Sequence, residues 1–342
     1  MSDGKKGIGI VGFGYWGPNL ARNFAALDDC RLAAVCEIRP ELAKRAAEYY
    51  PSAKVTGDYD ELLMDDGVDA VVISTPVSTH YDLAMKALRA GKDVLAGKPL
   101  TRTSTEAREL IDTASDHGRV LAVDHTFLYT PAVRKIKKIM DSGELGQIAY
   151  MDSVRVNLGM FQQDVNVIYD LAPHDISIAC YLLDEDPYTV RAVGATYSGR
   201  DVEYLAYIHL EYSEGLTAHF HLNWLSPIKI RRTLIAGRNR MIVYDDMETS
   251  EKVKIYDRGI TIADDDLDSL YKTYVDYRTG DMIAPKLDTT EALAAEAAHF
   301  AECMDTRRNP LTDGEAGLRV VRIIEAAQAS IDRGGEKMEL AR

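Results

Sequence analysis

Short apolar runs alternate with amphipathic stretches over the first third of the chain. Strand-like runs lie at residues 7–11, 31–36, 70–74, 93–96 and 120–123. Helical periodicity joins them at residues 19–27, 41–50, 83–90 and 105–115. The run at 70–74 is apolar throughout its length, as in a parallel strand covered on both faces. This alternation predicts an α/β Rossmann domain with a doubly wound parallel sheet.

The pattern changes after Pro131. Period-two alternation predicts longer strands at residues 148–156, 190–196, 204–212, 216–224, 231–236 and 241–244. Helical segments are expected at residues 132–140, 170–183, 290–304 and 315–331. We therefore expect two domains, residues 1–126 and 127–342, the second of the α+β class with a mostly antiparallel open sheet and helices.

Composition narrows the range of partners. The 342 residues carry 54 acidic and 40 basic side chains, a formal net charge of −14, which disfavours binding to nucleic acid. No apolar run approaches the roughly 20 residues of a membrane span. The four cysteines show no CxxC pair and no zinc-ligand spacing, so no metal site is expected and we interpret them as reduced thiols of a cytoplasmic protein.

The sharpest local motif is Gly12-x-Gly14-x-x-Gly17, which lies between a predicted strand and a predicted helix. Gly12 suits a tight turn, Gly14 admits a pyrophosphate close to the backbone, and Gly17 lets the helix pack against the strand. The N–H groups at the start of the helix would bind the phosphates. The spacing predicts a dinucleotide site.

An acidic residue follows at the distance that this site requires. Glu37 ends the second predicted strand, 20 residues after Gly17, where a carboxylate can accept hydrogen bonds from the adenosine ribose. Such a carboxylate repels a 2′-phosphate and favours NAD over NADP. Arg39 could neutralise that phosphate, so NADP stays open. Glu37 could also be a solvated charge at the end of a strand.

Four segments together resemble the Gfo/Idh/MocA family of glucose-fructose oxidoreductases and inositol dehydrogenases. They are Gly9-Ile10-Val11-Gly12-Phe13-Gly14-Tyr15-Trp16-Gly17, Ser74-Thr75-Pro76 with His80, Gly97-Lys98-Pro99-Leu100, and Asp170-Leu171-Ala172-Pro173-His174-Asp175. The resemblance covers nearly the whole chain. It implies a Rossmann domain followed by a sheet domain whose open face often mediates oligomerisation, and hydride transfer between a nicotinamide and a secondary alcohol.

The resemblance also implies site residues. By matched position, Lys98, Asp170 and His174 line the reaction centre. The cofactor would contact Gly12, Phe13, Gly14, Tyr15, Trp16, Gly17, Glu37, Arg39, Ser74, Thr75, Pro76, His80 and Lys98. His80 alternatively caps the helix that follows it. Gly97 is a departure, because the family usually has glutamate before the lysine; this puts in doubt how the nicotinamide ribose is held.

The residue types suit alcohol oxidation, in which a base must accept the hydroxyl proton. His174 is the best candidate for this base, since histidine as a residue type titrates near neutrality. Asp170 lies four residues earlier, on the same face of a helix. Pro173 is tolerated if this is the first helical turn, where the dipole favours neutral imidazole and ionised aspartate. Lys98, at the carboxyl end of a strand, could stabilise an alkoxide or relay the proton.

Further substrate contacts are expected from His125, at a strand end, and from Asn157 and Tyr169 in a polar stretch before the Asp/His helix. We expect His219 and His221, on one strand face, to belong to the sheet. An isolated Asp-x-x-x-His could be an ordinary helix start, and an isolated lysine a surface residue.

These features predict an NAD(P)-dependent oxidoreductase acting on a ring hydroxyl of a sugar or nucleotide sugar, with C3 suggested by family analogy. A homo-oligomer, dimer or tetramer, is expected. Two alternatives stay open. One is a glycosidase or lyase that uses NAD for transient oxidation; the other is a non-catalytic dinucleotide-binding sensor, motivated by Gly97.

Overall fold

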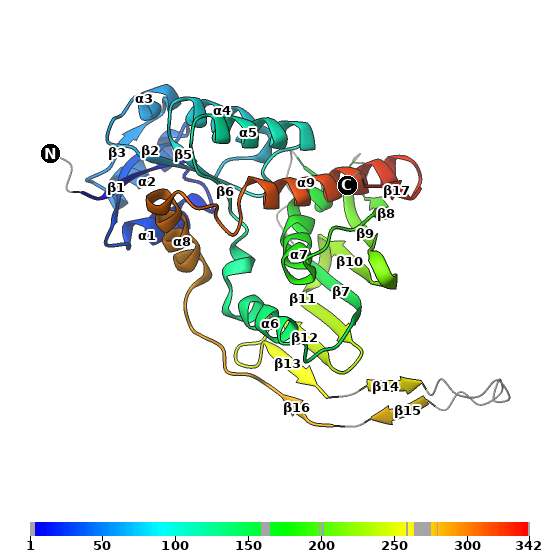
Figure 1. Cartoon of the computed structure of the whole chain (residues 1–342). Helices are drawn as coiled ribbons and strands as arrows, with labels where there is room; N and C mark the ends of the chain where they lie inside the picture. The colour runs from blue at the N-terminus through cyan, green and yellow to red at the C-terminus, as the bar shows by residue number, and fades with distance from the viewer. Residues whose placement is uncertain are drawn as a thin grey trace. The chain divides into compact units, whose positions relative to one another are not determined.

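The computed structural model describes residues 4–158, 165–197, 199, 202–257, 259–262, 275–278 and 280–340 (Figure 1). The chain forms two compact units. The first comprises Met1–Thr130, Gln163–Val165 and Thr290–Glu325; the second comprises Pro131–Gln162, Asn166–Thr289 and Ala326–Arg342. Within the described part of the chain, none of the helices has the length and apolar content needed to cross a membrane.

A six-stranded parallel sheet forms the centre of the first unit. Its strands are β1 (Lys6–Val11), β2 (Cys30–Cys36), β3 (Lys54–Thr56), β4 (Ala70–Ile73), β5 (Asp93–Ala96) and β6 (Leu121–Val123). Their order is β3-β2-β1-β4-β5-β6, so the strand order reverses between β1 and β4. Open α/β sheets bind ligands beyond the carboxyl ends of strands at such a point. The predicted Rossmann fold is confirmed.

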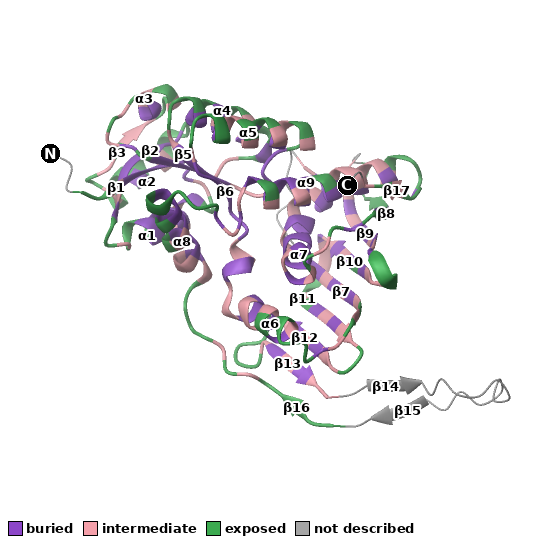
Figure 2. Cartoon of the chain, in the orientation of Figure 1, coloured by how far each residue is buried: buried purple, intermediate pink, exposed green. Residues whose placement is uncertain are grey.

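Helices cover both faces of this sheet (Figure 2). One face packs against α1 (Gly17–Ala25), α2 (Pro40–Tyr49) and α8 (Ala292–Thr306). The other face packs against α3 (Tyr59–Leu63), α4 (His80–Arg89), α5 (Ser104–Asp116) and part of α9 (Gly314–Asp332). Successive strand residues point to opposite faces, so the apolar runs fill both layers.

The predicted domain division assigned residues 290–325, which include helix α8 and most of α9, to the second domain. The structure places them in the first unit. Arg22 of α1 pairs with Glu291 through two N–O contacts of 3.0 and 2.6 Å, and Arg307 donates to buried Asp93 at 2.7 Å. These contacts join segments far apart in the chain, which a linear boundary at residues 126/127 cannot represent.

The second unit contains a nine-stranded sheet in the order β16-β13-β12-β11-β7-β10-β9-β8-β17. Its strands are β7 (Ile148–Leu158), β8 (Thr189–Thr196), β9 (Glu203–Glu211), β10 (Thr217–Asn223), β11 (Leu225–Gly237), β12 (Met241–Asp245), β13 (Val253–Tyr256), β16 (Met282–Ile283) and β17 (Met338–Glu339). β14 (Gly259–Ile262) and β15 (Val275–Arg278) pair separately. The nine-stranded sheet is antiparallel except for the β7–β10 pair, so the expected mostly antiparallel sheet is confirmed.

One face of this sheet is buried and the other is open (Figure 2). In β9, Tyr204, Ala206, Ile208 and Leu210 are buried, whereas Tyr207 between them is 49% exposed. The long helix α7 (Val167–Leu183) packs against β7, β9 and β10, and α6 (Pro131–Asp141) packs against α7. His219 lies on the open face of β10 and contacts Asp152 at 2.9 Å, in agreement with its expected place in the sheet.

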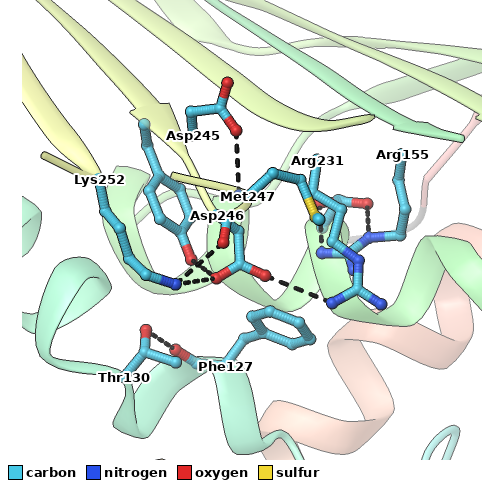
Figure 3. A network of polar contacts seen from close by, with 10 residues as sticks. Phe127, Thr130, Arg155, Arg231, Asp245, Asp246, Met247 and Lys252 are labelled. Carbon is cyan, nitrogen blue, oxygen red and sulfur yellow. Dashed lines mark hydrogen bonds and ion pairs between the residues drawn. The ribbon is translucent and has the colours of Figure 1, made fainter. Parts of the chain in front are cut away.

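Charged groups link the strands to helix α7 and to the turn after β12. Arg155 of β7 donates from Nε to Oδ2 of Asp175 on α7 at 2.6 Å and from Nη2 to Oδ1 at 3.0 Å. Figure 3 shows Arg155 together with a second cluster, in which Asp246 accepts from Lys252 at 3.1 Å and from Arg231 at 3.3 Å. Asp175, the last residue of the Asp170–Asp175 motif, thus pairs with a buried arginine.

Candidate functional site

The glycine-rich turn has the close contacts that its motif predicts. Gly12 has φ +88°, and a Cβ there would lie 2.6 Å from the carbonyl oxygen of Ser74; a Cβ at Gly17 would lie 2.1 Å from that of Gly12. Both positions therefore exclude a side chain. A Cβ at Gly14 would meet only the flexible end of Arg39, at 3.1 Å. This is the pattern of a turn packed on its inner side and open to a ligand at its middle glycine.

Helix α1 begins directly after this turn. Trp16 is its N-terminal flanking residue and Pro18 lies in its first turn, with no side-chain cap on the first N–H groups. Tyr15 is 79% exposed, and its ring stacks on that of Trp16. An uncapped helix start beside an open turn suits an anionic phosphate group. Phe13, by contrast, has a fully buried side chain, so only its backbone belongs to the turn.

Glu37 follows β2 and is buried against the turn. Its Oε2 accepts the backbone N–H of Phe13 at 2.7 Å, and its Oε1 accepts both the backbone N–H and the Nε–H of Arg39 at 3.0 Å. Burial is the largest single influence on the pKa of Glu37 and raises it, but the hydrogen bonds from Arg39 and Phe13 together outweigh burial and lower the pKa. Glu37 is therefore an anion that braces the turn, and Arg39 lies against it.

The segments after β4 and β5 are tied together by His80. This residue is 2% exposed, and its ring nitrogens lie 2.9 Å from the carbonyl oxygens of Pro99 and Thr75. Ser74 and Thr75 are half-buried and Pro76 is exposed at the carboxyl end of β4. His80 thus holds the backbone next to Lys98 from inside the fold, instead of capping α4 with its side chain.

Gly97, the departure from the family motif, has little room for a side chain. A Cβ there would lie 3.0 Å from Cε1 and 3.1 Å from Nε2 of His80, and 3.3 Å from the carbonyl oxygen of Ile73. Because His80 is held by hydrogen bonds at both ring nitrogens, it cannot move away without losing one of them.

We expect Gly97→Ala to lower the free energy of unfolding by about 1–3 kcal/mol through this crowding. Urea unfolding of the purified protein would measure the change. Gly57→Ala is the matched control, because its Cβ would meet nothing closer than 3.8 Å. Equal stability of the two variants would contradict the proposed crowding.

Lys98 lies two residues beyond the end of β5, at the carboxyl edge of the sheet, as predicted. The Lys98–Pro99 peptide bond is cis. His125, at the end of β6, is 1% exposed, and neither of its ring nitrogens has a hydrogen-bond partner among the described residues. Burial, and next the charge of Lys98, lower the pKa of His125 to about 3. His125 is therefore a neutral imidazole at physiological pH.

Asp170 and His174 lie one turn apart on α7. The helix begins at Val167, and Asn166 caps it by accepting the N–H groups of Ile168 and Tyr169. Pro173 therefore lies inside the helix, which corrects the expectation that it belongs to the first turn. Asp170 stays in the first turn and gains from the helix dipole, whereas His174 lies one turn too far along for this effect.

Trp224 holds the Asp170 side chain, and sequence reasoning missed it. Its indole Nε1–H donates to Oδ2 of Asp170 at 3.0 Å, and its ring, 1% exposed, packs edge-on against Tyr204. A buried tryptophan needs an acceptor for its N–H, so its position after a strand near the Asp/His helix was an available signal. Asn157, near the end of β7, and Tyr169, on α7, are half-buried.

The cysteines and acidic residues do not form a metal centre in the described part of the chain. All four cysteines are buried, and none of them forms a disulfide. Burial raises the pKa of Cys30 to about 12 and that of Cys36 to about 11, which makes these thiols unreactive at neutral pH. Their place in the core is as predicted.

Comparison with known proteins identifies both halves of the chain. Residues 6–125 match the model of the oxidoreductase family with an NAD-binding Rossmann fold, and residues 133–243 match the GFO/IDH/MocA C-terminal domain. The chain is 30% identical to UDP-N-acetylglucosamine 3-dehydrogenase of Acidithiobacillus ferrooxidans over 318 residues, which cover 92% of this chain and 93% of that protein.

Solved structures agree with this assignment. The structure of the A. ferrooxidans enzyme superposes with a TM-score of 0.81 at 27% identity, covering 96% of this chain and 98% of that one. Levoglucosan dehydrogenase in complex with NADH and levoglucosan shares the fold, with a TM-score of 0.84 at 21% identity over 99% of this chain and 100% of that one.

A further sequence relative is inositol 2-dehydrogenase 2 of Saccharopolyspora erythraea, which is 33% identical over 196 residues, 56% of this chain and 58% of that protein. The chain belongs to the Gfo/Idh/MocA family of NAD-binding oxidoreductases.

Proposed function

We propose that this protein is an NAD-dependent dehydrogenase that oxidises a ring hydroxyl, at C3, of a sugar or nucleotide sugar, and catalyses the reverse reduction. The observation that carries this proposal is the similarity to a UDP-N-acetylglucosamine 3-dehydrogenase over 92% of the chain. The second support is that Lys98, Asp170 and His174 match the positions at which the family places its reaction centre.

The first unit fits a dinucleotide. Gly12 and Gly17 pack the turn so that the uncapped start of α1 faces outward, and Glu37 provides an anionic acceptor beside it. When bound, NAD supplies the acceptor for the hydride. Ser74, Thr75, Pro76 and His80 would shape the site beyond β4, with His80 acting through the backbone that it holds.

Each proposed catalytic residue has a separate task. Half-buried His174 accepts the hydroxyl proton as the C–H bond breaks. Asp170, fixed by Trp224, orients the substrate hydroxyl. Lys98 stabilises the negative charge that develops on oxygen.

His125 supports a substrate contact of another kind. A buried neutral imidazole whose nitrogens have no partner in the described chain costs free energy unless a ligand satisfies it. We assign it a hydrogen bond to a substrate hydroxyl, with Asn157 and Tyr169 as further polar contacts.

We expect Glu37→Ala to weaken NAD binding by about 10–100-fold, since it removes both the ribose acceptor and the brace on the Phe13 N–H. NADP binding should weaken less, because the carboxylate that repels a 2′-phosphate is also lost. Calorimetric titration with each cofactor measures the two constants. Equal losses for both would remove the role of Glu37 in cofactor choice.

A substrate screen tests the function as a whole. The purified protein would be incubated with NAD and with UDP-N-acetylglucosamine, other UDP- and dTDP-sugars, free sugars and inositols, and the absorbance of reduced nicotinamide followed. Turnover with a sugar or a nucleotide sugar is expected. Tight NAD binding without net reduction on any substrate would contradict the proposal.

We further propose a cytoplasmic homo-oligomer, a dimer or a tetramer. Four buried cysteines that form no disulfide suit a reducing compartment. The open face of the nine-stranded sheet carries exposed apolar side chains, among them Val193, Tyr207 and Ile230, which suit contact with a second copy.

A further inference from the structure

Two acidic side chains of the first unit are withdrawn from water near the glycine-rich turn. Asp124 follows β6 directly and is 5% exposed, and Glu296 on α8 is 1% exposed. Neither belongs to a family motif discussed above. Burying an ionised carboxyl group is costly unless hydrogen-bond donors or cations meet it.

Asp124 has such donors. The indole Nε1–H of Trp16 donates to its Oδ2 at 2.5 Å, and the hydroxyl of Thr126 donates to its Oδ1. Both oxygens of Asp124 therefore accept a hydrogen bond.

Glu296 has the opposite environment. Both of its carboxyl oxygens are buried, and the polar groups that face them are the Asp124 carboxylate and the Thr126 hydroxyl. Burial is the main cause that raises the pKa of Glu296 well above its ordinary value, and the neighbouring Asp124 carboxylate raises it further; Thr126 has the smallest influence and lowers it. His125, next to Asp124 in the chain, is neutral and supplies no positive charge. Burial beside a second carboxyl group therefore favours the protonated form of Glu296.

We infer that Asp124 and Glu296 form a buried carboxyl pair with one proton, and that this pair fixes Trp16 and thereby the start of helix α1 in the shape that binds the dinucleotide. This inference rests on the proposed function for its second half. The proton on Glu296 removes the repulsion between two carboxylates, so that Asp124 can keep its charge for the indole N–H.

Trp16 is well placed to transmit this restraint. It comes between Gly14 and Gly17, and its backbone carbonyl accepts the N–H groups of Asn19 and Leu20 at 2.9 and 3.3 Å, which form the first turn of α1. The residue is 37% exposed, so burial alone does not hold it. The bond to Asp124 therefore restrains residues 14–17, the part of the turn that we assign to the phosphates.

The proton has a consequence for stability. The pKa of Glu296 is raised on folding, so the folded protein binds the proton more tightly than the unfolded chain does. The free energy of unfolding that this provides is fully present below the ordinary pKa of 4.5 and declines as the pH rises from there toward the folded pKa. Glu296→Gln replaces the proton by a permanent N–H donor. Thermal unfolding of the full-length, cofactor-free protein from about pH 5 to about pH 9 should show the variant gaining about 2–4 °C over wild type toward the alkaline end.

Glu291→Gln, near the start of the same helix, is the matched control. Its exposed carboxylate pairs with Arg22, which lowers its pKa, so its removal should leave the alkaline decline as in wild type. The same pH dependence in Glu296→Gln and in wild type would overturn the carboxyl pair.

The role of Trp16 is tested by cofactor affinity. We expect Trp16→Phe and Asp124→Ala each to raise the Kd for NAD by about tenfold, and the double variant to bind no more weakly than either. Tyr81→Phe, which removes an aromatic hydroxyl–carboxylate bond with Glu109 outside the assigned site, should leave this Kd within about twofold. An unchanged Kd in Trp16→Phe would overturn the restraint, even if Asp124→Ala does not fold. Should wild type not bind NAD at all, the proposed function and the role of Trp16 both fail, whereas the pH comparison still decides the carboxyl pair.

Discussion

Asp175→Ala is expected to lower the free energy of unfolding by about 3–5 kcal/mol, because it leaves a buried guanidinium without its carboxylate. Asp175 and Arg155 each expose only 4% of their side chains. Arg155 keeps its charge at any accessible pH, so it cannot relieve the loss by deprotonation. Urea unfolding at neutral pH would measure the effect.

An exposed pair provides the comparison. Glu144 contacts Arg240 at 2.5 Å with 46% of its side chain exposed, and Glu144→Gln should change stability by about 0.5 kcal/mol or less. The double variant Arg155→Met/Asp175→Leu should recover part of the loss, since well-packed apolar residues can replace a buried ion pair. A loss in Asp175→Ala no larger than that in Glu144→Gln would contradict the account.

The sequence pattern predicted the first sheet well because its strands are buried on both faces. The run at residues 93–96 coincides with β5, and that at 70–74 with β4 apart from its last residue. Two short elements were missed, β3 (Lys54–Thr56) and α3 (Tyr59–Leu63). Neither is long enough for periodicity to emerge. The local signal for α3 is its N-cap Asp58, whose side chain accepts the N–H of Asp60.

Contacts between residues far apart in the sequence could not be predicted from local patterns. Helix α8 was predicted as a helix, but its packing in the first unit depends on contacts such as Arg22–Glu291, which no local pattern contains. The hydrogen bonds of the two tryptophans are also absent from any local pattern. The only two in the chain each donate an indole N–H to an aspartate, Trp16 to Asp124 and Trp224 to Asp170.

The residue at which helix α7 begins decides which of its side chains the helix dipole affects. Its N-cap is Asn166, four residues before Asp170, where an Asn before an apolar run is a usual start signal. With this start the dipole acts on Asp170 but not on His174. The orientation of Asp170 comes from its hydrogen bond with Trp224.

The final prediction concerns the reaction itself. We expect Lys98→Ala and His174→Ala each to lower kcat by about a thousandfold or more, because the developing alkoxide loses its counter-charge in one and the hydroxyl proton loses its acceptor in the other. The Kd for NAD should change by less than about threefold, or 0.7 kcal/mol, since neither side chain builds the turn that we assign to the pyrophosphate.

Steady-state kinetics on the substrate found in the screen, with calorimetric titration of NAD, would measure both quantities. Lys86→Ala and His117→Ala are matched controls: Lys86 is exposed and pairs with Asp60, and His117 lies exposed at the end of α5. These controls should retain turnover. Near-normal kcat in Lys98→Ala and His174→Ala would show that other groups carry the proton and the charge, and would end the assignment of this pair.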